Sequence, residues 1–121
     1  MNDGPGELDR VPGKIEVAPA AIAMAAARTV LACYGVVGIA NRKLRHGKAE
    51  VLDDHQYADG IVVTVQDGGV VVEVYVVVEY GTRISEVAHN VMSAVRDALR
   101  RMLGTENVRV NVNVQGLRIS G

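Results

Sequence analysis

Apolar and polar residues follow two different periods along this chain. Residues 61–65 and 70–80 are β-branched runs, and residues 108–114 alternate strictly between valine and a polar residue. A period of two predicts strands that bury one face. The Asp-Gly-Gly at residues 67–69 separates the first two runs, and glycine accepts the positive φ of a tight turn. These two runs are therefore expected to form a hairpin.

The second of these runs is predicted to have unlike faces. Its even-numbered valines, from position 72 to position 78, fall on one side and are assigned to the core. The other side carries Glu73, Tyr75, Val77 and Glu79, and is expected to be half polar and partly wet.

Two stretches have the pattern of helices. Apolar side chains between residues 84 and 103 recur every three or four positions, which is typical of a helix with one buried face. Thr82 is expected to cap its start and Gly104 to end it. Residues 20–34 are almost wholly apolar and predict another helix, ending at Gly35. A helix with so little polar surface must be covered on more than one side.

The remaining segments predict minor elements. Residues 14–17 are expected to form a short first strand, residues 36–40 a short strand or extended turn, and residues 49–52 a weak strand. Together the elements indicate a single α+β domain: a mostly antiparallel sheet with two helices packed against it, in a strand order that the pattern leaves open. We assign residues 1–12 to a flexible tail and residues 13–121 to the folded domain.

The amino-acid composition limits the classes of function that the protein can have. The 121 residues include 13 basic and 14 acidic side chains, so the clear basic excess of a general nucleic-acid binder is absent. There is no Trp or Phe to stack a base or a flat cofactor, and no cofactor is expected. Cys33 is the only cysteine and is expected to be a buried thiol. We see no secretory signal, and residues 17–37 are too weakly hydrophobic to span a membrane, so we interpret them as a buried helix.

One basic stretch is a candidate contact for an anion or a partner protein. It consists of Arg42, Lys43, Arg45 and Lys48, together with His46. Such side chains bind phosphate in nucleic acids or anionic lipids, although the acidic residues that follow them neutralise the net charge. A small RNA-binding module that uses this stretch is therefore kept as an alternative function. The Gly-x-x-Gly spacing at residues 35–38 adds little, because its two central valines are wrong for clamping nucleotides.

Catalytic and metal sites find little support. One cluster of acidic and histidine side chains, within residues 53–59, resembles a set of metal ligands. It lacks the oxygen spacing of a calcium loop and has no second histidine at a zinc-like interval. We interpret it as a solvated loop, with a metal-dependent hydrolase as the competing hypothesis. His89 falls on the polar face of the second helix, and no serine has a base and an acid in its sequence context. No enzymatic activity is expected. The cluster comprises Asp53, Asp54, His55 and Asp59.

Three segments resemble the bacterial alkaline shock protein family. They are residues 13–18 leading into the first helix, residues 76–87 with their strand, Tyr-Gly and helix start, and the closing strand at residues 108–117. They occur in this order, and the likeness as a whole covers residues 13–119. The chain departs from the family pattern at residues 32–34, where Ala-Cys-Tyr replaces the usual acidic residue before the Gly-Val turn.

The resemblance implies a small cytoplasmic α+β protein that a separate anchor protein often holds at the inner face of the membrane. It further implies a link to cell-envelope stress and no established enzymatic activity. The first hypothesis is therefore a non-enzymatic scaffold that self-associates or docks a membrane-anchored partner. The nearly all-apolar first helix and the long strands fit such a role, since both are ready association surfaces.

Overall fold

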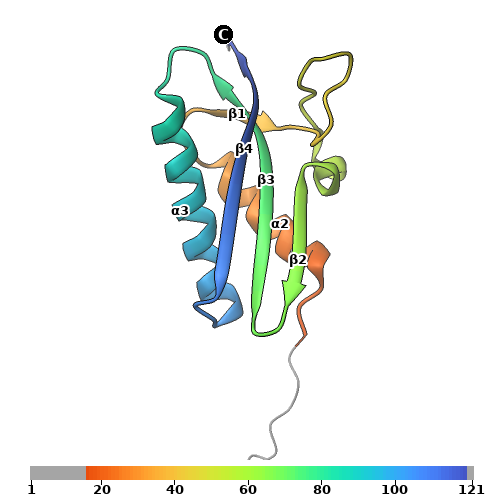
Figure 1. Ribbon diagram of the computed structural model, residues 1–121, viewed down its shortest axis with the longest axis vertical. Coiled ribbons are helices and arrows are strands. Elements are labelled where there is room, and N and C mark those ends of the chain that lie inside the picture. The colour runs from red at the N-terminus through yellow and green to blue at the C-terminus, as the bar shows by residue number, and fades with distance from the viewer. Residues whose placement is uncertain (1–15, 120–121) are drawn as a thin grey trace, which may run out of the picture.

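A four-stranded sheet backed by two helices forms the body of the protein (Figure 1). The computed structural model describes residues 16–119. In chain order the elements are α2 (Pro19–Leu31), β1 (Val36–Ile39), the short 3-10 helix η1 (Asp54–Asp59), β2 (Ile61–Gln66), β3 (Gly69–Glu79), α3 (Ile84–Leu103) and β4 (Val108–Arg118).

Strand β3 is the centre of the sheet. Its first half pairs antiparallel with β2, and its end pairs antiparallel with β1. Strand β4 pairs with β3 in parallel along nearly its whole length. Parallel neighbours require a long crossover, and the 20 residues of α3 provide it. The prediction of an α+β fold with a mostly antiparallel sheet and two packed helices is confirmed, and the pattern had not indicated the parallel pair.

The core lies between the sheet and the two helices. Val72, Val74 and Val76 of β3 are fully buried and face the helices, as their alternation predicts. Helix α3 contributes the apolar stripe expected from its spacing, and Ala26 and Ala27 of α2 are also fully buried. The stripe of α3 that enters the core consists of Val87, Val91, Val95 and Leu99.

Helix α2 ends earlier than predicted. It stops at Leu31, and Ala32 closes it in a right-handed conformation, with φ −85°. Gly35, expected at the helix end, instead lies in the turn before β1 with φ +88°. A Cβ at Gly35 would come within 2.7 Å of Val87 Cγ2, so α3 packs against this turn. Glycine is needed here for both its backbone conformation and its lack of a side chain.

The two ends of α3 differ in how well they were predicted. Thr82 as the N-cap is wrong: its hydroxyl donates a hydrogen bond to the Glu79 carbonyl at 2.7 Å, and Arg83 occupies the cap position without a side-chain hydrogen bond. Gly104 as the closing residue is confirmed. It adopts φ +69° and donates its N–H to the Arg100 carbonyl at 2.9 Å.

Two of the three minor strands can be compared with the structure. The strand predicted at residues 36–40 is confirmed as β1. The weak strand predicted at residues 49–52 is wrong, because only Val51 pairs, in an isolated bridge with Ala40. Of the strand predicted at residues 14–17, the first two residues lie outside the described part of the chain, and the other two are irregular. The proposed tail at residues 1–12 also lies outside it.

Candidate interaction surface

The sheet face that points away from the helices is partly covered by a loop. In one row across three strands, Gly38 of β1 pairs with Val77 of β3, which pairs with Gly116 of β4. Val77 lies on the side expected to be wet, yet it is only 1% exposed. The expectation fails at this position because Ala49 and Val51 lie on the row: a Cβ at Gly116 would meet Ala49 Cβ at 3.0 Å. The two glycines leave room for this cover.

The covering loop is a small hairpin, residues 41–50, which we call the basic hairpin. The Asn41 N–H donates to the Glu50 carbonyl at 2.8 Å. Nearer the tip, Arg45 and Lys48 exchange backbone hydrogen bonds of 2.8 and 3.0 Å, and His46 and Gly47 turn the chain with φ values of +52° and +75°. Two positive φ angles are typical of the tight turn that suits hairpins.

A side chain of β4 fixes the base of the basic hairpin to the sheet. The Gln115 amide donates through Nε2 to the carbonyl of Asn41 at 3.2 Å and to that of Arg42 at 2.9 Å. Gln115 lies where the β3–β4 register shifts, between the pairs of Val76 and Val77. The extra residue of this bulge is therefore used to hold the loop.

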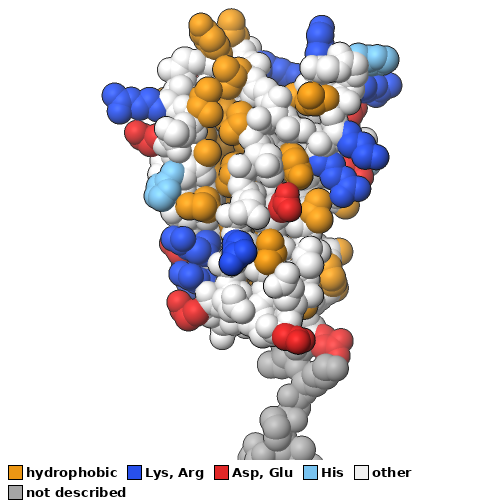
Figure 2. All heavy atoms as spheres, in the orientation of Figure 1, with side chains coloured by type: hydrophobic (Ala, Val, Ile, Leu, Met, Phe, Trp, Pro, Cys, Tyr) orange, Lys and Arg blue, Asp and Glu red, His pale blue; other side chains and the backbone are white. Residues whose placement is uncertain are grey.

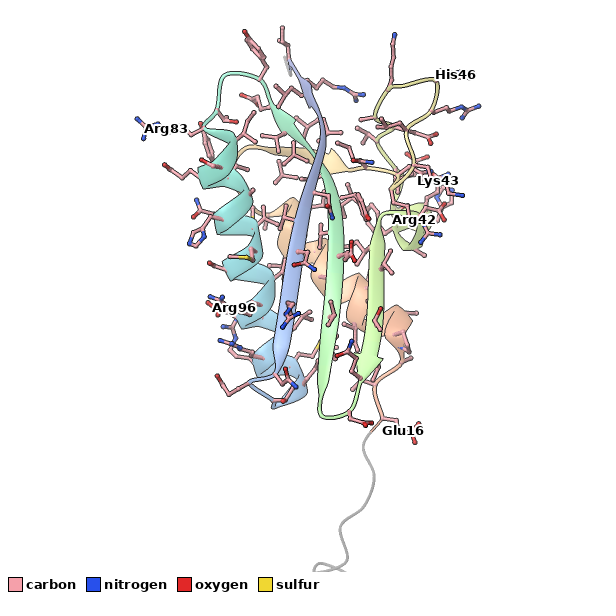
Figure 3. All side chains as sticks on the ribbon, viewed as in Figure 1. Glu16, Arg42, Lys43, His46, Arg83 and Arg96 are labelled. Carbon is pink, nitrogen blue, oxygen red and sulfur yellow. The ribbon has the colours of Figure 1, made fainter. Side chains whose placement is uncertain are left out.

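The predicted basic contact residues are all exposed but are spread along this hairpin (Figure 3). Arg45 Nη1 lies 3.4 Å from Glu50 Oε2, so its charge is partly compensated. Arg42 lies at the base, where its charge tends to lower the pKa of Tyr75, and Lys43 follows it. Lys48 pairs with Arg45 only through the backbone. The anion contact predicted for these residues stays a prediction.

The acidic stretch forms η1 rather than a shaped ligand set. Gln56 Oε1 accepts the Asp53 N–H at 3.1 Å, which secures the start of η1. His55 Nδ1 lies 3.6 Å from Asp54 Oδ1, and the two side chains are 75% and 86% exposed. Within residues 16–119, no group of three or more His, Cys, Asp or Glu side chains is placed to hold a metal ion.

The free edge of β4 is the most extended open surface of the sheet. In the described part of the chain β4 pairs only with β3, so its outer backbone edge has no strand beside it. Helix α3 lies outside β4 (Figure 1). We call the outer edge of β4, together with the pocket between its first residues and α3, the edge groove.

The two ends of the edge groove differ in chemistry. Hydrophobic side chains gather in a column over β4 and the space beside α3 toward the C-terminal end of the strand (Figure 2). At that end Tyr80, Leu117 and Ile84 are 65%, 46% and 40% exposed, and the Tyr80 N–H donates to the Arg118 carbonyl at 2.9 Å. Apolar exposure of this kind beside a free strand edge is typical of a binding surface.

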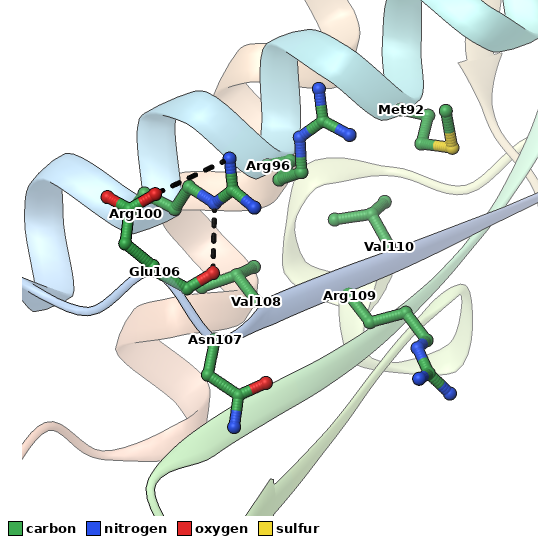
Figure 4. Close-up of a pocket in the computed structure, with 8 residues that line it drawn as sticks. All are labelled: Met92, Arg96, Arg100, Glu106, Asn107, Val108, Arg109 and Val110. Atoms are coloured by element: carbon green, nitrogen blue, oxygen red, sulfur yellow. Dashed lines mark hydrogen bonds and ion pairs between the residues drawn. The ribbon is translucent and has the colours of Figure 1, made fainter.

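At the start of β4 the groove opens into a cavity of about 310 Å³ with a basic lining (Figure 4). Arg100 forms part of the cavity wall and is held there by Glu106. Its Nε donates to the Glu106 carbonyl at 3.0 Å, and its Nη1 lies 3.8 Å from Glu106 Oε1. Arg96 Nε is buried without a hydrogen-bond partner among the described residues, and it lies 3.8 Å from Asp97 Oδ1 in an ion pair. The cavity is lined by Met92, Arg96 and Arg100 of α3 and by residues 106–110.

Sequence reasoning did not predict this basic cavity. In the sequence, Arg96 and Arg100 fall between the apolar positions of α3, and Arg109 falls between two valines of β4, so each is indicated only as an exposed charge. The short connection at residues 104–107 was the available signal, because it returns the chain from the end of α3 directly to β4. This connection brings the last turns of α3 and the first residues of β4 to one cavity, although the Arg109 side chain points to the other side of β4 from Arg96 and Arg100 (Figure 4).

Among residues 16–119, two ionisable side chains have shifted pKa values, and both shifts favour the neutral form. Burial raises the pKa of the Cys33 thiol, whose Sγ donates to the Thr29 carbonyl at 3.3 Å. Burial, and then the hydrogen bond from its hydroxyl to Glu73 Oε1 at 3.2 Å, raise the pKa of Tyr75. A thiol held protonated is a weak nucleophile, so Cys33 acts as a packing residue.

Known proteins resemble this chain along most of its length. YloU of Bacillus subtilis is 35% identical over 115 residues, covering 94% of this chain and 96% of that protein. Spy1614 of Streptococcus pyogenes is 36% identical over 110 residues, covering 90% and 91%. A solved structure titled MamM-CTD 215-293 is 12% identical, with a TM-score of 0.46, and the match covers 78% of this chain and 96% of that one.

No helix within residues 16–119 has both the length and the apolar character needed to cross a bilayer. The alkaline shock protein 23 family, described as having a cell envelope-related function, matches residues 7–119. The resemblance inferred from three segments of the sequence is thereby confirmed, and the chain belongs to this family.

Proposed function

We propose that this protein is a non-enzymatic scaffold of the cell envelope, which acts at the cytoplasmic face of the membrane by docking a membrane-anchored partner and by self-association. The observation that carries the proposal is the edge groove, in which an 11-residue strand leaves one side unpaired beside exposed apolar side chains. Surfaces of this kind bind other chains, because the free backbone groups and the apolar area are both satisfied by a partner.

The chemistry of the described side chains supports binding rather than catalysis. General acids and bases usually have pKa values tuned toward the working pH. The shifts at Cys33 and Tyr75 both move away from neutrality, and each side chain already donates a hydrogen bond within the fold. The polar lining of the basic cavity consists of arginines, an asparagine and Glu106, whose carboxylate lies 3.8 Å from Arg100 Nη1, so the cavity presents groups that recognise charge and shape.

The test is crosslinked co-purification of the full chain from its native host, with membranes prepared in the presence and absence of detergent, together with sedimentation velocity over a range of concentrations. We expect a membrane protein to be captured together with this chain, and the sedimentation coefficient to rise with concentration. A chain that stays monomeric at high concentration and captures no membrane protein would overturn the proposal.

The basic hairpin supplies a second contact in this proposal. Its residues Arg42, Lys43, Arg45 and Lys48 meet an anionic surface, either of the partner or of lipid headgroups beside it. Reversing Lys43 to Glu is expected to weaken capture of the membrane partner in a salt-dependent manner. Tight binding of RNA that weakens steeply with salt, and that disappears in the same variant, would instead favour a nucleic-acid module.

A further inference from the structure

We propose that the edge groove binds an extended segment of a partner protein, which adds to the sheet as a strand beside β4 and carries apolar residues followed by acidic ones. The inference rests on the proposed function and deepens it, since it names the docking surface and the chemistry of the bound segment.

The backbone of β4 is a suitable template for another strand. Val108–Arg118 contains neither proline nor lysine, the residues that commonly protect strand edges from pairing. The register with β3 is regular from Val108 to Val114, and the only shift follows Val114. A regular stretch of this length offers alternate outward N–H and C=O groups to a segment about 20 Å long, at roughly 3.3 Å per residue.

The side chains along the groove set the composition of the segment. Its upper end, at the C-terminal end of β4, is apolar, with Leu117 and Ile84 partly exposed. Val112 and Val114 are half-buried along the strand. Its lower end, at the start of β4, is basic: Arg109 is exposed and makes no ion pair within the described part of the chain. Arg96 Nε has no hydrogen-bond partner there, although it lies 3.8 Å from Asp97 Oδ1. Apolar side chains therefore fit the upper end, and carboxylates fit the lower end.

The direction of the segment follows from the same gradient. Antiparallel pairing forms the more stable ladder, so the segment is expected to run opposite to β4. It then passes the C-terminal end of β4 first and reaches Arg109 last. The apolar residues of the segment accordingly precede its acidic residues.

A second copy of this chain fits the groove less well. Two β4 strands paired about a two-fold axis would lie about 4.8 Å apart, whereas packed helices need about 8–10 Å between their axes. Because α3 lies outside β4, the two copies of α3 would be forced together over the seam (Figure 1). The two-fold axis would also place the arginine end of each copy against the apolar end of the other, so Arg96 and Arg109 would meet no acids. Self-association is therefore assigned to other surfaces.

The experiment measures binding of a fluorescent synthetic peptide as long as β4 to the full chain by anisotropy. The peptide alternates valine and threonine and ends in glutamates. We expect Arg109→Glu to weaken binding at least about tenfold, the loss that corresponds to one good charge pair. Arg96→Ala should weaken it in the same direction. Arg28→Glu, a matched charge reversal at an exposed position of α2 away from β4, should leave it unchanged.

Backbone methylation distinguishes strand addition from general hydrophobic binding. Peptides N-methylated on alternate residues come in two sets, and only one set has its amides facing β4. Strand addition predicts that one set loses binding and the other keeps it. Equal effects of both sets, or binding that is unaffected by Arg109→Glu and Arg96→Ala, would overturn the inference. The inference would also be overturned if these variants abolished dimerisation of the chain but left its binding of the peptide intact.

The same variants separate this inference from the proposed function. If Arg109→Glu still captures the membrane partner at the unaltered chain's level, the scaffold function stands and the edge groove is not its docking surface. If the unaltered chain captures no partner and stays monomeric but binds the peptide as described, the groove is a peptide site and the scaffold function fails.

Discussion

Val51 lies directly over Gly38, so that a Cβ built on Gly38 would come within 2.7 Å of Val51 Cγ1. Val51 directly follows the basic hairpin, so this contact is where the chain leaving the hairpin meets β1. The position of the hairpin on the sheet therefore depends on an absent side chain in the strand below it.

The Gly38→Ala variant is expected to lower the free energy of unfolding by about 1–3 kcal/mol, because the added methyl group overpacks a filled contact. Replacing Val51 by Ala in the same chain should recover part of this loss, since it removes the clashing Cγ1. Urea denaturation of the two single variants and the double variant forms a double-mutant cycle. Strictly additive losses would show that the two residues are not in contact.

Loss of the Gln115 amide should loosen the basic hairpin. Gln115→Ala removes two hydrogen bonds to backbone carbonyls and is expected to reduce stability by about 1–2 kcal/mol. Hydrogen exchange of the amides in residues 41–50 should speed up more than exchange in β3. Gln66→Ala, an exposed change at the end of β2, serves as the control and should leave both quantities unchanged. Unaltered exchange in the Gln115 variant would contradict the assigned role.

Burial along α3 should determine the effect of truncating its leucine and methionine side chains. Leu99 is fully buried and Met102, three positions later, is 43% exposed. Leu99→Ala is expected to destabilise the protein by about 2–5 kcal/mol through lost burial and a residual cavity. Met102→Ala should lower the free energy of unfolding by much less than Leu99→Ala does. Thermal denaturation of both variants tests the order, and similar losses would show that the helix is oriented differently.

Alkaline pH should destabilise the fold through Tyr75. Burial and Glu73 raise the pKa of Tyr75 above its usual value of 10.0, so the folded state favours the protonated phenol more than the unfolded chain does. This contribution is complete below the unfolded pKa and is lost as pH rises through the folded one. As pH rises from about 9 to about 11, the free energy of unfolding should therefore fall less in the Tyr75→Phe variant than in the unaltered protein. Parallel stability–pH curves in urea titrations would exclude this role.

Most elements of the fold were predictable because their periodicity is strong. The alternation in β2, β3 and β4 and the apolar stripe of α3 each indicate one buried face, and the structure confirms all four elements. Gly104 was recognisable because it directly follows the last apolar position of its helix. Gly35 follows an apolar run that continues past the end of α2, so the pattern alone placed the helix end too late.

Other features depend on contacts that no local pattern encodes. Val77 is buried by residues of the basic hairpin, which are distant in sequence, and the glycines beside it belong to two other strands. The turn at His46 was also hidden, since histidine is an uncommon residue at positive φ. The basic cavity needed the parallel pairing of β3 and β4, which sequence alternation does not distinguish from antiparallel pairing.

Strand β3 hydrogen-bonds to each of the other three strands, and this makes unfolding cooperative. No strand pair survives without it, so its central amides should open only when the whole domain opens. Those amides are expected to report the global free energy of unfolding, while the basic hairpin opens locally at lower free energy. A bound segment on the free side of β4 would thus be separated by a single strand from the most protected backbone in the molecule.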